Sequence, residues 1–293
     1  MHDPLTLSQT VPLILGGRTV AEYVWRPHLP NTLSPRPFLH PVRTLTGTTV
    51  TEAMPPDHRH HLGAGLAVPD AGGANFWGGR TYVRDQGSTL LPNHGTQRHH
   101  RWETRTDTDL THELHWIGPD QTTLLHEHRR ITARPLDHHA WALDFRYTLR
   151  NLTAAPLDFS SPGAKGRTGA GYGGFFWRAP LGNGDTTILG PDRNGIAHLH
   201  GSTVPWLALR NSGPAPWTLI LINPETEREP WFVRGDDYLG AGPALAWTKP
   251  LTAAPGNGPT RRIITVIADG DLSPQAIKAL VEAAAASPAP REA

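Results

Sequence analysis

The chain has 293 residues, with 27 basic and 26 acidic side chains and a formal charge of +1 at pH 7. This balance lacks the basic excess that binding to nucleic acid or an anionic membrane requires, so neither partner is expected. The absence of cysteine excludes disulfides, thiolate nucleophiles and cysteine-bound metal centres. Without a basic, apolar leader or a run of about 18 apolar residues, the sequence predicts a soluble, cytoplasmic protein.

Alternation of apolar and polar residues is the main structural signal along the chain. Residues 110–116, 122–133 and 141–150 all alternate, and the turn signals between them predict an antiparallel meander of three strands. In the third strand, five large residues are expected to face the core: Trp141, Leu143, Phe145, Tyr147 and Leu149.

Further short strands, each bounded by Pro, Gly, Asn or Asp, are predicted at 22–26, 175–178, 206–210, 217–222, 231–234, 244–248 and 262–268. The 29 Pro and 30 Gly that punctuate the chain are typical of an all-β protein. Because no linker or fixed repeat divides the strands, we expect one large antiparallel two-sheet β-sandwich domain over residues 1–293.

One short C-terminal helix is predicted. Ser273 can cap it, Pro274 suits its first position, and Leu272 can pack on Ile277. Its apolar stripe is expected to pack on the edge of a sheet. Residues 287–293 are expected to form a disordered tail.

A histidine-rich stretch, Pro-Asp-His-Arg-His-His-Leu-Gly at 56–63, carries the strongest functional signal, and Asn-Phe-Trp-Gly-Gly follows at 75–79. Imidazole can exchange a proton near neutral pH and is a common metal ligand. Of the 17 His, 12 lie between His58 and His139. The cluster predicts a site for a polar ligand, although scattered His on solvated strands is the alternative.

A metal site is a second possibility, because strand residues two apart point the same way. Three pairs have this spacing: His58 and His60, His126 and His128, and His198 and His200. None is followed by the Glu and the later Gly and His of a cupin-type site. We therefore expect no metal and no cofactor, with a His-ligated metal enzyme as an alternative.

Glu127 is the carboxylate of most interest, because it shares its strand face with Leu125 and Ile131, close to Arg129. Burial raises the pKa of a carboxyl group and a neighbouring guanidinium lowers it, so a base balanced between these effects can abstract protons. A structural Glu–Arg ion pair is the alternative interpretation.

The Gly-rich run at 163–174 precedes a strand rather than a helix and lacks the Gly-Lys-Ser/Thr ending of a phosphate loop. It therefore predicts a long loop over the mouth of the sandwich.

Several motifs resemble the bacterial family often labelled methane oxygenase PmoA-like. They are Arg36 to Leu45, Asp57 to Gly63, Asn75 to Tyr82, Asn93 to Gly95, Ala170 to Arg178, Pro205 to Leu209 and Pro230 to Arg234. The resemblance covers nearly the whole chain and departs at Ala164–Arg167, where relatives carry Thr-Asn before the Gly. It implies a large sandwich similar to the galactose-mutarotase type and an association with sugar catabolism, whereas the label belongs to a membrane protein.

These observations predict a carbohydrate-active enzyme, of epimerase, mutarotase or lyase type, with acid–base chemistry on a sugar or oxidised sugar. The expected catalytic residues are His58, His61 and Glu127. The expected substrate-binding residues are His60, Asn75, Trp77, Arg80, His94, Arg167, Tyr172 and Arg178, with Trp77 and Tyr172 as an aromatic platform. A non-catalytic sugar-binding sandwich remains an alternative. The expected partner is a small sugar, and the oligomeric state is left open.

Overall fold

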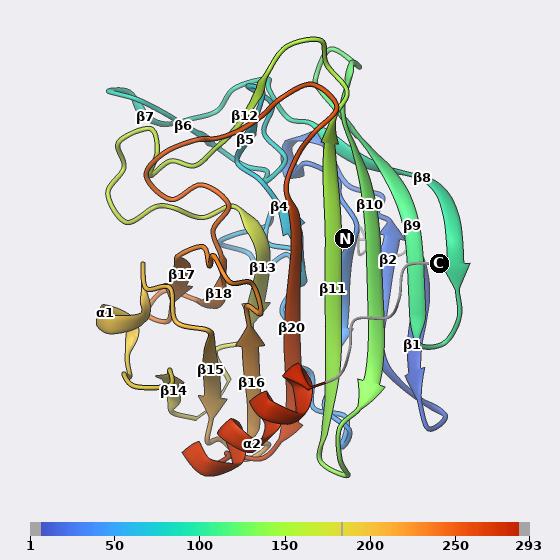
Figure 1. Cartoon of the computed structure of the whole chain (residues 1–293), viewed down its shortest axis with the longest axis vertical. Helices are drawn as coiled ribbons and strands as arrows, with labels where there is room; N and C mark the ends of the chain where they lie inside the picture. The colour runs from blue at the N-terminus through green and yellow to red at the C-terminus, as the bar shows by residue number, and fades with distance from the viewer. Residues whose placement is uncertain (1–6, 183, 287–293) are drawn as a thin grey trace.

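The computed structural model describes residues 7–182 and 184–286, and within them two large antiparallel sheets enclose a common apolar core. In sheet order, the seven-stranded sheet contains β1 (Gln9–Leu15), β2 (Arg18–Arg26), β3 (Phe38–Val42), β4 (Ala64–Ala67), β13 (Gly174–Ala179), β18 (Leu239–Pro243) and β17 (Trp231–Arg234). The eight-stranded sheet contains β14 (Thr186–Leu189), β15 (Trp206–Asn211), β16 (Trp217–Ile222), β20 (Thr260–Asp269), β11 (Ala140–Asn151), β10 (Thr123–Pro135), β9 (Asp109–Ile117) and β8 (Thr96–Arg105). The predicted all-β two-sheet sandwich is confirmed, and Figure 1 shows the eight-stranded sheet across the view.

The predicted meander is confirmed, because β9, β10 and β11 pair in chain order as antiparallel neighbours. Every second residue of β11 from Trp141 to Leu149 is buried in the core, as the alternation predicts.

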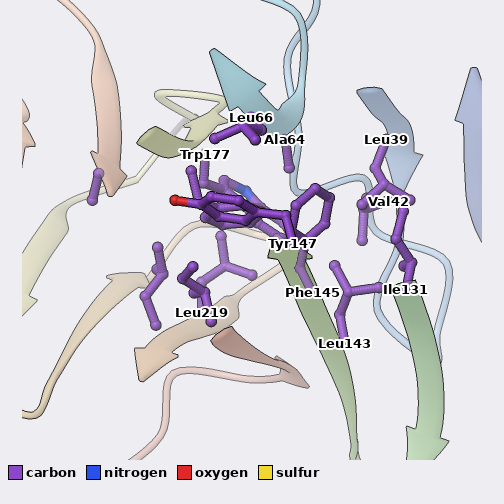
Figure 2. Packing of buried hydrophobic residues seen from close by; sticks show 14 of the residues in the cluster. Leu39, Val42, Ala64, Leu66, Ile131, Leu143, Phe145, Tyr147, Trp177 and Leu219 are labelled. Carbon is purple, nitrogen blue, oxygen red and sulfur yellow. The ribbon is translucent and has the colours of Figure 1, made fainter. Parts of the chain in front are cut away.

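The core lies between the inner faces of the two sheets, where large side chains from both meet (Figure 2). Figure 2 labels side chains from the two sheets: Leu39, Val42, Ala64, Leu66 and Trp177 from one, and Ile131, Leu143, Phe145, Tyr147 and Leu219 from the other. Trp177 also donates from its indole nitrogen to the Val50 carbonyl at 2.9 Å, which satisfies its buried polar atom.

One strand prediction is wrong. Residues 244–248 follow a strand rather than form one, and the strand itself is Leu239–Pro243. The strand was not predicted because glycine has a low strand propensity. Close packing nevertheless requires glycine in this segment. A Cβ at Gly242 would lie 1.9 Å from the Phe175 carbonyl oxygen, so only glycine lets β18 approach β13.

The predicted C-terminal helix is confirmed as α2 (Pro274–Ala285), where the Ser273 hydroxyl accepts from the Ala276 N–H at 3.3 Å. It contacts β16 and β20 rather than a sheet edge, so the expected position is wrong. The outer face of these central strands carries Ile220 and Val266, which pack with Ile277 of the helix. Figure 1 shows the helix lying over this part of the sheet. The tail prediction for 287–293 falls outside the described residues.

The remaining elements are short. A three-stranded sheet contains β19 (Leu251–Ala253), β12 (Leu157–Ser160) and β5 (Asp70–Ala71), and a hairpin contains β6 (Thr81–Val83) and β7 (Gly87–Thr89). A 3-10 turn, η1, spans Asn31–Leu33 and a single helical turn, α1, spans Ile196–Leu199. In the part of the chain that the structure describes, no helix is long and apolar enough to cross a membrane.

Candidate functional site

Alternation along β13 sends neighbouring side chains to opposite faces of the seven-stranded sheet. Phe175 and Trp177 enter the core, whereas Phe176 points to the outer face and packs with Trp77 and Phe232. These outer residues form an aromatic floor over which loops from distant parts of the chain converge.

A cavity of about 350 Å³ lies over this floor. Its walls come from four segments of the chain and are formed by Asp57, His58, His60, His61, Trp77, Arg80, Ser88, Arg167, Ala170, Tyr172, Phe232, Arg234, Asp237 and Tyr238. Seven of the predicted site residues are thus brought together by the fold. The Gly-rich loop contributes Arg167, Ala170 and Tyr172, so it covers the outer face of this sheet.

An aspartate orients one of the histidines. Nδ1 of His58 lies 2.6 Å from Oδ2 of Asp57, and this hydrogen bond is the main reason that the pKa of Asp57 is lowered. An ionised carboxylate only accepts hydrogen bonds, so Nδ1 must carry the proton. In the tautomer that this bond selects, the lone pair lies on Nε2, where a general base requires it.

His61 is stacked on His58, with ring centroids 4.7 Å apart, and only 3 % of its surface is exposed. Burial, and after it the neighbouring His60 and His58, hold the pKa of His61 far below its ordinary value. Burial likewise lowers the pKa of His60 to about 3. Both rings are therefore neutral at pH 7, so neither carries the proton of an imidazolium acid.

Tyr238 completes the cluster, although sequence reasoning missed it. Its ring centroid lies 5.0 Å from that of His61 and 5.2 Å from that of His58. Burial raises the pKa of Tyr238 to about 12, so the phenol keeps its proton at neutral pH. Arg178 does not line the cavity. Its guanidinium lies 4.6 Å from the centre of the Tyr238 ring, and it pairs with Glu52 at 2.8 Å, so it supports the cluster from behind.

Asn75 and His94 also lie outside the cavity wall, where they hold the turn that carries Trp77. Oδ1 of Asn75 accepts from the N–H groups of Trp77 and Gly78, both at 2.8 Å. His94 donates from Nε2 to the Gly79 carbonyl at 2.7 Å. Gly78 has φ +96°, and a Cβ there would lie 2.6 Å from the Leu33 carbonyl oxygen, so the turn requires glycine.

Glu127 is not part of the cavity. Its side chain faces the core, on the opposite side of the seven-stranded sheet from the aromatic floor, and it is fully buried. Its two oxygens accept from Trp116 Nε1 at 2.7 Å and from Arg129 at 2.6 and 2.9 Å. The alternation placed Glu127 inside but could not show that a second sheet would cover it. The ion-pair interpretation therefore describes it, and we leave it out of the site.

The expected aromatic platform of Trp77 and Tyr172 offers little exposed ring surface at Trp77. Trp77 exposes only 5 % of its surface, because its ring packs against Tyr172 at 4.8 Å and Phe176 at 5.1 Å between centroids. That is too little for a sugar ring to stack on its face.

Besides Tyr238, sequence reasoning missed three lining residues on strand β17 and the turn after it: Phe232, Arg234 and Asp237. The Pro230–Arg234 motif and the Gly-Asp-Asp turn that follows were visible in the sequence. Nothing local indicated that they would meet the histidine stretch.

Among the described residues, no group of three or more His, Asp or Glu side chains is arranged to hold a metal ion. The His58 and His60 rings lie 5.9 Å apart at 57°, and Asp57 holds Nδ1 of His58.

Residues 10–282 match a family of unknown function (DUF6807). This match overturns the resemblance to a methane oxygenase PmoA-like family, because the family model that fits the chain is a different one. No curated protein matches the sequence. A candidate aldose 1-epimerase from Escherichia coli K12 aligns with 67 % of this chain and 76 % of its own, at 10 % identity and a TM-score of 0.34. The heparinase III BT4657 gene product aligns with 86 % of this chain and 33 % of its own, at 10 % identity and a TM-score of 0.30.

Proposed function

This chain belongs to the DUF6807 family, and we propose that its cavity binds a small sugar or oxidised sugar and transfers protons to and from it, as an epimerase, mutarotase or lyase does. The observation that carries the proposal is the contact between an Asp57-oriented imidazole, His58, and a protonated phenol, Tyr238, in the wall of one cavity. A base and an acid in contact are the groups that general acid–base catalysis needs.

The protonation states give the two groups different roles. Nε2 of His58 accepts a proton, while Asp57 stabilises the imidazolium that forms. Tyr238, whose pKa is raised to about 12 by burial, donates one. Neutral His61 packs between the acid–base pair and the aromatic floor and fixes the position of both rings.

The cavity suits a small, oxygen-rich ligand. Its volume of about 350 Å³ lies at the lower end of the range for small-molecule sites. The arginine side chains in its wall can donate hydrogen bonds to the oxygen atoms of a sugar. A non-catalytic sugar-binding sandwich would be favoured by an open aromatic face, and Trp77 offers none.

The test is turnover of a panel of monosaccharides, disaccharides and sugar acids, followed by NMR for anomer exchange, epimers and unsaturated products. His58→Asn and Tyr238→Phe should each lower turnover by about a hundredfold or more, the usual contribution of one positioned proton-transfer group. His138→Asn, at an exposed position outside the cavity, is the matched control. Turnover should survive exhaustive chelation.

Three results would contradict the proposal. Wild-type turnover in both variants would exclude this acid–base pair. Loss of turnover on chelation, with recovery on adding metal, would favour a metal enzyme. Sugar binding without any turnover would favour a binding module.

A further inference from the structure

Arginine side chains at the cavity are not neutralised by the protein. The guanidinium of Arg167 makes no hydrogen bond or ion pair to any described residue, and that of Arg80 donates only to the Ser88 carbonyl at 3.2 Å. Arg234 is half-buried and donates to the Gly169 and Val233 carbonyls at 3.1 and 2.9 Å. Backbone contacts orient Arg80 and Arg234 without cancelling their charge.

The carboxylates in the cavity do not supply the negative charge that would neutralise these arginines. Asp57 is bound to His58, and Asp237 forms no ion pair with any of the arginines among the described residues. Because no carboxylate of the described residues pairs with Arg80, Arg167 or Arg234, the cavity presents free guanidinium groups to its contents. Arg forks bind carboxylates through paired hydrogen bonds, so a carboxylate on the ligand is the natural counterion.

These cations lie beside the proton-transfer groups. Arg234 donates to the carbonyl of Gly169, which is two residues beyond Arg167, so both come to the same end of the cavity. Tyr238 is close enough for its ionisation to respond to Arg234 and Arg167, and it also touches His58. A carboxylate held by the two arginines would therefore bring its neighbouring carbon to the acid–base pair.

We propose that the ligand is a sugar carboxylate of the uronate class, bound through Arg167 and Arg234, and that the enzyme is a lyase acting at the carbon next to the carboxylate. This inference rests on the proposed function. His58 accepts the proton from C5, the C–H electron pair moves into the carboxylate, and an enediolate forms. Its electrons then make the C4–C5 double bond as the C4–O bond breaks, and Tyr238 donates its proton to the leaving oxygen. No oxidant or reductant is required, and exchange with water restores both side chains.

The placement of the two groups also predicts stereochemistry. Because the His58 and Tyr238 rings touch, with centroids 5.2 Å apart, they reach the sugar from one side. This favours loss of the C5 hydrogen and the C4 oxygen from the same face of the ring. A 4-O-glycosyl D-glucuronate has that arrangement, whereas in a 4-O-glycosyl D-galacturonate the two groups lie on opposite faces.

The experiment uses these two uronate disaccharides and neutral cellobiose as probes. Product formation is followed by the ultraviolet absorbance of the unsaturated uronate, and the dissociation constant is measured by calorimetry. The wild type should cleave the glucuronate probe and bind it at least tenfold more tightly than cellobiose. Arg167→Gln should raise the dissociation constant of the glucuronate probe by about tenfold or more, the contribution of a charge-assisted hydrogen bond, and raise that of cellobiose by a much smaller factor. Arg150→Gln, at an exposed position on β11 outside the cavity, controls for net charge.

Each outcome separates the two proposals. If neutral sugars are bound and converted as well as the uronates and Arg167→Gln has no effect, the carboxylate inference fails while acid–base catalysis on sugars stands. If only the galacturonate probe is cleaved, the same-face geometry is wrong. If the glucuronate probe binds through Arg167 without cleavage or exchange of its C5 hydrogen for deuterium, the lyase step is overturned. If no sugar or uronate is bound or converted, both proposals fail.

Discussion

Replacing Arg129 with Met removes the cation that neutralises Glu127 inside the sandwich. Both side chains are fully buried, and the guanidinium donates to Glu127 at 2.6 and 2.9 Å, to the Tyr23 hydroxyl at 2.9 Å and to Gln97 Oε1 at 3.0 Å. Met fills a similar volume but leaves a buried carboxylate without its counterion. Breaking a buried ion pair in this way costs about 3–5 kcal/mol of folding free energy.

The assay is urea unfolding followed by tryptophan fluorescence, with the midpoint compared between variants. The double variant Arg129→Met/Glu127→Gln removes both charges and should be more stable than Arg129→Met alone, because its buried amide carries no charge. Arg150→Met, at an exposed site, should change stability by no more than about 0.5 kcal/mol. A loss below about 1 kcal/mol for Arg129→Met, or no recovery in the double variant, would refute the view that this pair is a coupled structural element.

Two further predictions concern stability. The pKa of His60 is lowered to about 3 and that of His61 is also lowered, so both rings are neutral in the folded protein. Below pH 6.5 the unfolded chain therefore binds more protons than the folded protein. The free energy of unfolding should fall by up to about 1.4 kcal/mol per pH unit for each histidine as the pH falls from 6.5 toward 3. His60→Asn/His61→Asn should flatten this slope in pH-dependent urea titrations, His138→Asn should not, and an unchanged slope in the double variant would contradict the assignment. Ser273→Ala should lower stability by about 1 kcal/mol through loss of the cap on α2, and equal stability by thermal unfolding would show that the cap contributes nothing.

Strand positions were predictable wherever one face of a strand meets the core and the other meets water. Residues 141–149 follow this pattern, and so does the amphipathic helix that begins after Ser273. Strand β18 was not predictable from local pattern, because its Gly-Ala-Gly sequence has no alternation. The position of β18 depends on the space beside the Phe175 carbonyl, and that space is set by the neighbouring strand β13.

The candidate site was predictable in part. The density of imidazoles at His58–His61 pointed to a ligand site, and the fold brings these rings to a cavity with Trp77, Arg167 and Tyr172. Their catalytic and binding roles stay predictions. Tyr238 was missed because a single tyrosine after a turn carries no local signal of proton chemistry.

By itself, the sequence determined the β class, the meander, the capped helix and the identity of the histidine loop, because each depends on neighbours close along the chain. Tertiary structure decided which distant loops meet. The order β4, β13, β18, β17 places the turn before Tyr238 beside the loop of His58, and these segments are far apart in sequence. It also decided the role of Glu127, since alternation shows that a side chain is buried but not which sheet covers it or which cation it meets there.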